Sequence, residues 1–225
     1  IGISEDSTVA KDITAKFING YVPKYSDEDQ TEDILERLLH GRKSDKTRDE
    51  LFSAIKEEAP KMFGSIAKMA LNKVQESNPK KKFKGVEALG ILKADVDNLG
   101  LLFSCGFREG RQTLSRLAAL SRQLNSFFSI FLPHFLKTDN RFQDTYTVFA
   151  GGDDLFLIGP WNRIIALAEL LNKEFSRYVC HNKDITISAG ISVHKPGEPI
   201  MTIAESAEHA LALSKSKNKD IKDKI

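Results

Sequence analysis

Residues 146–158 of the chain read YTVFAGGDDLFLI, which places two glycines and two aspartates between two short apolar runs. The runs Tyr146–Ala150 and Leu155–Ile158 are typical of strands, and the glycines between them supply the positive φ angles that a tight turn requires. The stretch therefore predicts a β-hairpin that carries Asp153 and Asp154 at its tip.

From residue 86 onward the pattern runs strand, helix, strand, strand, helix, strand, helix. Besides the hairpin, we expect strands at Ala88–Val96 and Ile185–Val193. Amphipathic periodicity predicts helices at Leu114–Leu136, Trp161–Tyr178 and Thr202–Lys217. Antiparallel strands with helices on one face form an α+β sandwich of the ferredoxin-like type, and the open face of such a sheet can hold a substrate.

The first part of the chain has a different character. It is highly charged, and its apolar spacing predicts helices at Thr31–Leu39 and Arg48–Val74 and a short strand at Ile18–Val22. No catalytic pattern occurs there. We therefore divide the chain into a mainly helical N-terminal extension, residues 1–85, and an α+β domain, residues 86–225.

The composition narrows the class of protein. Hydrophobic residues make up 41% of the 225 residues and charged residues 28%, which is ordinary for a soluble globular protein. A net charge of +2 argues against a protein that coats nucleic acid by charge alone. No apolar run approaches the ~20 residues that span a bilayer, and no signal peptide is visible, so we expect no membrane association. The cysteines, Cys105 and Cys180, are expected to be buried or half-buried free thiols.

The paired aspartates of the hairpin are the sharpest chemical feature. Two adjacent carboxylates at a tight turn repel each other unless a counter-charge lies near them. A divalent cation supplies such a charge, and Mg²⁺ prefers one or two carboxylates together with water and phosphate oxygens. A solvated Asp-Asp turn without any ligand explains Asp153 and Asp154 equally well.

The strand expected at Ala88–Val96 shifts this balance towards a metal site. Asp95 and Asp97 share one of its faces, while Leu92, Ala94 and Val96 take the other. Acids therefore project from the open face of the sheet at the C-terminal end of that strand. Asp95 with Asp153 and Asp154 fits a two-metal site for phosphoryl transfer, and these three residues are the predicted catalytic residues and metal ligands.

Two stretches carry a family resemblance. Residues 90–100 read GILKADVDNLG, and residues 149–161 read FAGGDDLFLIGPW. Together with Leu114–Arg116 and Ser121–Arg122, they resemble the second palm domain of the large subunit of type III CRISPR effector complexes, in particular of subtype III-A, the Csm complex. The resemblance covers roughly residues 60–225.

This resemblance implies a palm that joins ATP molecules 3′ to 5′ into cyclic oligoadenylates when target RNA is bound, with Mg²⁺ or Mn²⁺ as the metal. It implies as partners the other subunits of the effector complex, the CRISPR RNA, the target RNA and the first palm domain of the same longer protein. The family's nuclease domain carries a His-Asp motif, which none of the five histidines here forms, so we expect DNA cleavage to lie outside this chain. The expected location is the prokaryotic cytoplasm.

The resemblance also implies contacts to the nucleotide. Ser121 lies on the apolar face of its predicted helix, where its hydroxyl needs a partner. That partner is either ATP or the carbonyl four residues earlier. Two lysines four residues apart fit the triphosphate, although a frayed, solvated tail explains them as well. The expected nucleotide-binding residues are Gly151, Gly152, Asn98, Ser121, Lys215 and Lys219.

Two other functions compete with this one. A GGDEF-like dinucleotide cyclase also has a Gly-Gly-acid-acid hairpin, but that family typically has Glu and Phe where this chain has Asp154 and Leu155. A catalytically silent palm that only binds nucleotide, or only serves as a scaffold, is the second alternative. The intact acids argue against the silent palm, and nucleotide binding with a divalent metal would discriminate the two.

Overall fold

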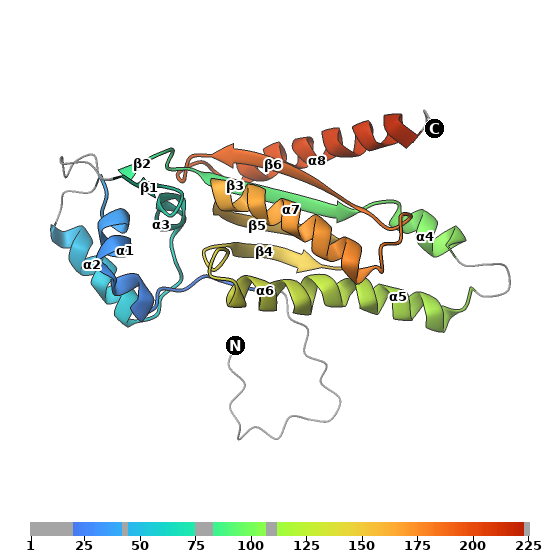
Figure 1. Ribbon diagram of the computed structural model, residues 1–225, viewed down its shortest axis with the longest axis horizontal. Helices are drawn as coiled ribbons and strands as arrows, with labels where there is room; N and C mark the ends of the chain where they lie inside the picture. The colour runs from blue at the N-terminus through green and yellow to red at the C-terminus, as the bar shows by residue number, and fades with distance from the viewer. Residues whose placement is uncertain (1–19, 42–44, 75–82, 107–111, 223–225) are drawn as a thin grey trace, which may run out of the picture.

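The computed structural model of the chain describes residues 20–41, 45–74, 83–106 and 112–222. Its centre is an antiparallel sheet of β3 (Leu89–Val96), β4 (Tyr146–Gly151), β5 (Asp154–Pro160) and β6 (Ile187–His194). The strands lie side by side in the order β4-β5-β3-β6 (Figure 1). With a helical crossover between β3 and β4 and another between β5 and β6, this is the ferredoxin-like arrangement, so the expected α+β fold is confirmed.

One face of the sheet is covered by α5 (Leu114–Ser126), α6 (Leu132–Thr138) and α7 (Trp161–Tyr178). The periodicity that predicted these helices arises because one side of each is buried against the sheet. Aromatic rings fill the centre of this core, where Phe127 stacks or packs edge-on against four other rings. The fully buried side chains of this core include Leu92, Ala94, Phe128, Leu155, Leu157, Ile164 and Leu167.

The helix expected at Leu114–Leu136 changes its winding near its end. A π-helical segment, η3 (Phe127–Phe131), joins α5 to α6 just before Pro133. Proline has no N–H to donate and its ring clashes with the carbonyl four residues earlier. The wider π turn accommodates that ring, so the helix continues past Pro133.

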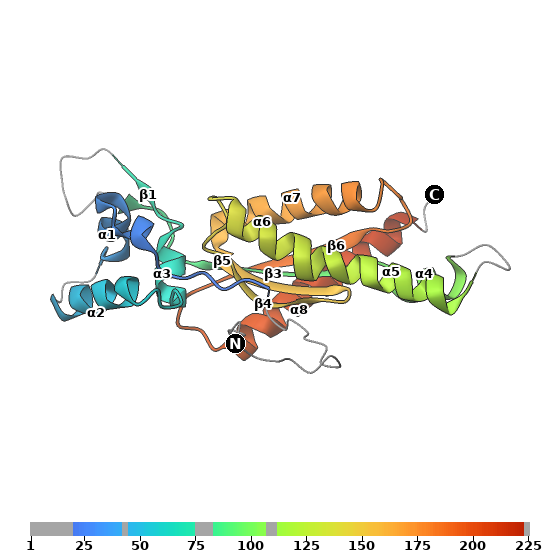
Figure 2. The same ribbon diagram turned by 90° about the horizontal axis from the view of Figure 1, so that it is seen from below.

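The second face of the sheet is also partly covered. Helices α3 (Phe63–Lys68) and α8 (Ile200–Lys222) pack on it, and Figure 2 shows α7 and α8 on opposite sides of the strands. The buried side chains between them include Leu89, Ile91, Phe156, Ile158, Ile203 and Ala207. We expected this face to be open for a substrate, whereas the structure restricts the opening to its acidic end, where Asp95 and Asp154 are half-buried.

Small residues on β6 explain why α8 lies so close to the sheet. The strand alternates, as expected, and its small residues face α8. A Cβ atom added to Gly190 would lie 2.2 Å from the backbone nitrogen of Leu211 and 2.6 Å from the carbonyl carbon of Ala210. The helix backbone therefore occupies the space that any side chain at this position would need.

The N-terminal extension is mainly helical, as expected, and lies at the end of the sheet away from the β4–β5 turn (Figure 1). A small core of its own includes Tyr25, Leu38 and Ile55. The extension contains η1 (Asp27–Gln30), α1 (Glu32–Leu38), α2 (Asp45–Lys56), α3, β1 (Asn72–Lys73) and β2 (Phe83–Lys84).

Two expectations for this extension were wrong. The helix expected at Arg48–Val74 is interrupted between α2 and α3, because Pro60 cannot continue a helix and instead forms a β-bridge with Lys24. The strand expected at Ile18–Val22 begins outside the described residues, and its described part is not a strand. The Tyr21 carbonyl nevertheless accepts a hydrogen bond of 2.8 Å from the amide of Thr147 on the edge strand β4.

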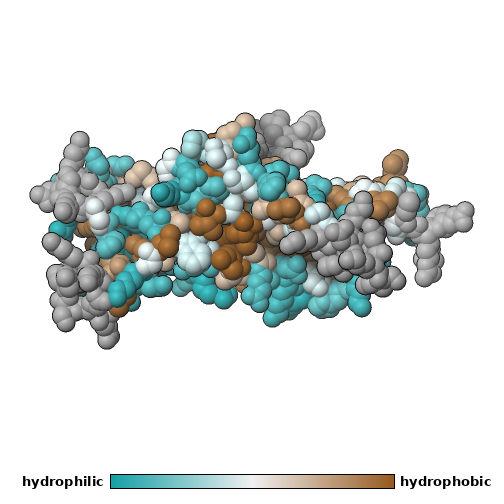
Figure 3. Space-filling view, turned by 90° about the horizontal axis from the view of Figure 1, so that it is seen from above, coloured by the Kyte–Doolittle hydropathy of each residue, from teal (hydrophilic) through white to brown (hydrophobic). Residues whose placement is uncertain are grey.

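The surface is mixed in character. Figure 3 shows apolar side chains near the middle of one face, with polar side chains on either side of them. Among the described residues, no helix is both long and apolar enough to cross a membrane. The thiol of Cys180 is free, as expected, but it is exposed and not buried or half-buried. The side chain of Cys105 lies outside the described residues.

Candidate active site

The acidic residues meet at the end of the sheet where β3 stops and the β4–β5 hairpin turns, on the right in Figure 1. Asp95 is the direct register partner of Asp154 across the β3–β5 pair. Opposed residues of an antiparallel pair project from the same face, with Cβ atoms about 4.5–5.5 Å apart. The two carboxylates therefore stand side by side on the face that α8 partly covers.

The hairpin turn is held from two sides. Gly152, the first loop residue, has a φ of +70°, which glycine adopts without strain, and no atom lies within 4 Å of the Cβ that another residue would bring. The carbonyl of Asp153 accepts a hydrogen bond of 3.1 Å from the amide of Val96. On the helical side, the amide of Gly152 donates a 2.9 Å hydrogen bond to Oδ1 of Asn125 on α5.

The electrostatics of the acids favour a nearby positive charge. The pKa of Asp154 is raised above its usual value, first because burial removes water from the carboxyl and further because Asp95 and Asp153 lie near it. Lys93 and the amide of Leu155 partly oppose this shift. A negative charge on Asp154 is thus costly in this environment, and binding a cation would lower the cost.

Two lysines reach this site. Lys215 of α8 forms an ion pair with Oδ2 of Asp95. Lys93, which lies on the same strand face as the acids, forms an ion pair with Glu208 of α8. The pKa of Lys93 is raised, chiefly by the hydrogen bond to Glu208 and further by the charges of Asp154 and Asp95. Helix α8 thus brings one acid and one base over the acidic end of the sheet.

The remaining predicted residues lie at varying distances from the acids. Lys219 follows Lys215 by one turn of α8, and its side chain lies outside the described residues. Asn98 is exposed at the start of α4 (Leu99–Cys105), in a left-handed conformation with a φ of 54°. Asp97 is engaged elsewhere, because its Oδ2 accepts a 2.7 Å hydrogen bond from the hydroxyl of Thr186.

The expectation of a buried face for Ser121 was wrong. Ser121 is exposed, because the first half of α5 extends beyond the end of the sheet (Figure 1). The helical periodicity identified the correct side of the helix but carried no information on where the sheet ends. An exposed hydroxyl needs no internal partner, since water satisfies it.

The three predicted metal ligands do not form a closed cluster in the described part of the chain. Across residues 20–41, 45–74, 83–106 and 112–222, no three His, Cys, Asp or Glu side chains are grouped so as to hold a metal ion. Asp95 and Asp154 do stand together, and Asp153 is adjacent to them in the turn. Two carboxylates that leave room for water and phosphate oxygens match the preference of Mg²⁺, so the residues present fit such an ion without enclosing it.

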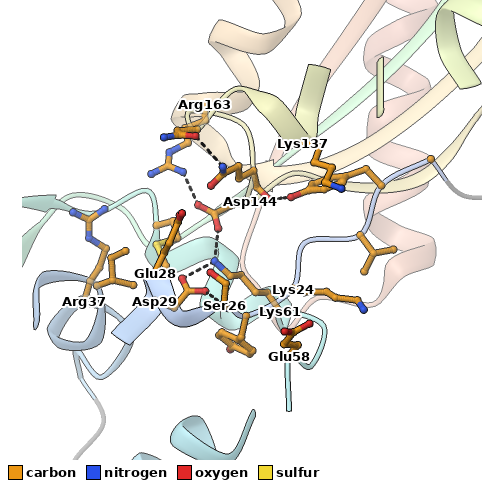
Figure 4. A pocket seen from close by; sticks show the side chains of 18 residues that line it. Lys24, Ser26, Glu28, Asp29, Arg37, Glu58, Lys61, Lys137, Asp144 and Arg163 are labelled. Carbon is orange, nitrogen blue, oxygen red and sulfur yellow. Dashed lines mark hydrogen bonds and ion pairs between the residues drawn. The ribbon is translucent and has the colours of Figure 1, made fainter. Parts of the chain in front are cut away.

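A large cavity lies away from the acidic residues. It has a volume of about 980 Å³ and is lined by residues of the N-terminal extension and of the sheet end remote from the acids. Figure 4 shows a buried ion network on its wall, which the sequence analysis did not foresee. The Lys61 ammonium contacts Asp29 at 2.7 Å and Asp144 at 2.9 Å, and Arg163 contacts Asp144 at 2.6 Å. This network fastens the extension to the α+β domain.

Comparison with known proteins identifies the domain. A family model described as "Cas10/Cmr2, second palm domain" matches residues 88–225. The chain belongs to this family. The match spans the whole sheet and α8, so the second palm domain of Cas10 comprises the part of the chain that carries the acidic site.

Similar proteins are named for a CRISPR role. The chain is 37% identical over 141 residues to a protein of Methanocaldococcus jannaschii, and 42% identical over 120 residues to one of Enterococcus italicus. Both are named "CRISPR system single-strand-specific deoxyribonuclease Cas10/Csm1 (subtype III-A)". The alignments cover 59% and 53% of this chain but only 18% and 15% of those relatives.

Solved structures share the fold. A Csm1–Csm4 subcomplex of the type III-A interference complex matches with a TM-score of 0.60 at 24% identity, over 72% of this chain and 22% of that chain. A Csm1–Csm4 cassette in complex with AMPPNP matches with a TM-score of 0.58 at 25% identity, over the same shares of the two chains. A cassette in complex with pppApA matches with a TM-score of 0.52 at 27% identity, over 59% of this chain and 20% of that chain.

Proposed function

We propose that this Cas10-type palm binds ATP together with Mg²⁺ or Mn²⁺ and joins ATP molecules into cyclic oligoadenylate when a type III-A effector complex recognises target RNA. The observation that carries the proposal is the direct pairing of Asp95 with Asp154 at an open sheet end, beside Lys93 and Lys215. Similar Csm1 proteins have been crystallised with AMPPNP, which is an ATP analogue, and with pppApA, which is a linear dinucleotide with a triphosphate.

Each group of the site has a distinct task in this proposal. When bound, the metal neutralises charge on the transferring phosphoryl group. Asp95 and Asp154 would hold the cation, and Asp153 at the turn would complete the acidic side. Lys215, which pairs with Asp95 here, would be free to contact the triphosphate with a cation on that carboxylate, and Lys219 follows on the same helix. Gly151 and Gly152 leave room for the nucleotide, while Asn98 and Ser121 border it.

The wider assembly is part of the same proposal. The chain spans less than a fifth of the curated relatives that it matches, so the activity and partners of the whole protein are inferred from them. We propose that it works with the first palm domain of the longer protein, with the other Csm subunits, and with CRISPR RNA and target RNA in the prokaryotic cytoplasm. The deoxyribonuclease activity named for the relatives is assigned to no residue here, because no histidine of this chain is followed by aspartate.

Metal-dependent ATP binding tests this proposal at the level of the chain. Titration calorimetry of the 225-residue chain with ATP is compared with and without Mg²⁺ or Mn²⁺. We expect Asp95→Asn to abolish the metal-dependent part of the binding, because one carboxylate of the pair is lost. Asp184→Asn, which changes an exposed acid outside the site, is the matched control. ATP binding that needs no metal, or that is unaffected by Asp95→Asn, would contradict the proposal.

A further inference from the structure

The hydrogen bond from the Gly152 amide to Oδ1 of Asn125 connects the acidic turn to a helix on the other side of the sheet. The two residues are 27 positions apart, and the bond measures 2.9 Å. Gly152 is otherwise exposed and has open space around it. A glycine turn without side-chain packing has many accessible conformations, so a single directional bond there restricts it strongly.

Asn125 is itself held in place from within its helix. Its Nδ2 donates to the hydroxyl of Ser129 at 3.4 Å, and that hydroxyl donates to the Asn125 carbonyl at 2.7 Å. These contacts direct Oδ1, the acceptor, towards the turn. The nearby residues Leu124 and Phe128 are buried in the main core, which fixes this part of the helix relative to the sheet.

The turn has a second tether on its opposite strand. The Val96 amide donates to the carbonyl of Asp153, so β3 holds the residue after Gly152 while Asn125 holds Gly152 itself. Asp153 is therefore held in the turn, and Asp154 keeps its place opposite Asp95. Because an error of about 1 Å in such a constellation can cost about a hundred-fold in rate, a tether at this position has consequences for chemistry.

We propose that Asn125 is a positioning residue of the palm: by accepting the Gly152 amide, it holds the Gly-Gly-Asp-Asp turn in the geometry that phosphoryl transfer requires. Asn125 touches no reacting atom in this account and acts through Asp153 and Asp154. Its catalytic consequence rests on the proposed cyclase function, whereas its hold on the turn does not. The two parts are therefore tested by separate measurements.

The first measurement follows the turn itself. Amide hydrogen exchange of Gly152 is measured by NMR in the 225-residue chain without nucleotide. We expect Asn125→Ala to speed the exchange of this amide about ten-fold or more, since removing the acceptor removes about one hydrogen bond of protection. Asn125→Asp, which keeps an acceptor in the same place, retains the protection. Ser126→Ala is the matched control, because that hydroxyl donates to the Arg122 carbonyl of its own helix.

The second measurement follows the reaction in the effector complex that contains the longer protein. We expect Asn125→Ala to lower kcat for oligoadenylate synthesis about ten- to a hundred-fold with little change in KM for ATP, because orientation and not binding is lost. Asn125→Leu keeps a similar side-chain volume without the acceptor. It replaces Asn125→Ala if the smaller residue prevents folding, with the same results expected.

The outcomes separate the inference from the proposed function. Unchanged Gly152 exchange in both Asn125→Ala and Asn125→Leu would overturn the inference, as would unchanged kcat in an active complex. A wild-type complex that makes no oligoadenylate would refute the proposed function, and faster Gly152 exchange in Asn125→Ala would then still support the tether. Loss of exchange protection in Ser126→Ala as well would show a general loosening of α5 and would also overturn the inference.

Discussion

The contact of α8 with the sheet depends on the absence of a side chain at one position, and Gly190→Ala tests this directly. An alanine Cβ would lie 2.2 Å from the nitrogen and 2.7 Å from the Cα of Leu211, both backbone atoms that no rotamer change can move. Ordinary contacts between such atoms are about 3.5 Å or longer, so α8 has to shift by about 1 Å. The shift falls between Glu208 and Lys215, the residues that reach Lys93 and Asp95.

The expected magnitude follows from measured overpacking of protein cores. Extra methyl groups in a well-packed site typically cost about 1–3 kcal/mol of folding free energy. In a domain of this size, each kcal/mol lowers the melting temperature by about 2–4 °C, so we expect a decrease of about 2–12 °C. The assay is thermal unfolding of the 225-residue chain followed by circular dichroism.

A matched substitution separates steric displacement from the general effect of replacing glycine. Gly100 lies in α4 with no atom within 4 Å of its added Cβ. Gly100→Ala is therefore expected to leave stability unchanged or to raise it by up to about 1 kcal/mol, by restricting the unfolded chain. Equal melting temperatures for Gly190→Ala and Gly100→Ala would refute the close packing of α8 on β6.

Three further outcomes are expected. Lys61→Ala should lower the free energy of unfolding in urea by about 3–5 kcal/mol, because it leaves Asp29 and Asp144 buried without this counter-charge. The double variant Lys61→Met with Asp29→Asn should lose less stability. Equal losses in the two variants would contradict the buried network. Asp154→Asn should raise the melting temperature of the metal-free chain at pH 7, because the raised pKa of Asp154 means that its ionised form opposes folding. The gain should shrink as the pH falls towards the range in which that carboxyl protonates, because the protonated carboxyl no longer opposes folding. A lower melting temperature of Asp154→Asn at pH 7 would refute this explanation. Ser121→Ala should leave the melting temperature within about 1 °C, since the side chain is exposed, while weakening apparent ATP affinity; unchanged affinity in calorimetry would remove Ser121 from the nucleotide site.

The sequence predicted the features that depend on local periodicity. The alternation at Ile185–Val193, the hairpin around Gly151 and Gly152, and the helical spacing at Trp161–Tyr178 all correspond to observed elements, because burial of one face imposes a repeat on the residues themselves. The sequence also predicted that the acidic residues of β3 and of the hairpin meet, because strand ends and turns fix which face and which end of a sheet a residue occupies.

The features that the sequence did not reveal are long-range contacts. The small face of β6 indicated only a polar surface, and nothing local showed that α8 would pack on Gly190. Asn125 is one polar residue in an amphipathic helix, and its partner lies 27 residues away. Ser121 fell on the predicted buried side, but periodicity does not show that α5 extends past the sheet. The break at Pro60, by contrast, had a local signal, because proline cannot continue a helix whatever the apolar spacing around it.

The central claim is that the paired acids of the hairpin organise oligoadenylate synthesis. The most direct test is ATP turnover by the effector complex that contains this chain, with products identified by mass, in the presence and absence of target RNA. We expect cyclic oligoadenylate from the wild-type complex with target RNA. We expect none above background when Asp153 and Asp154 are both replaced by Ala, because the carboxylates that would bind the metal ion are lost. Normal product from the double variant in a correctly assembled complex would contradict the account.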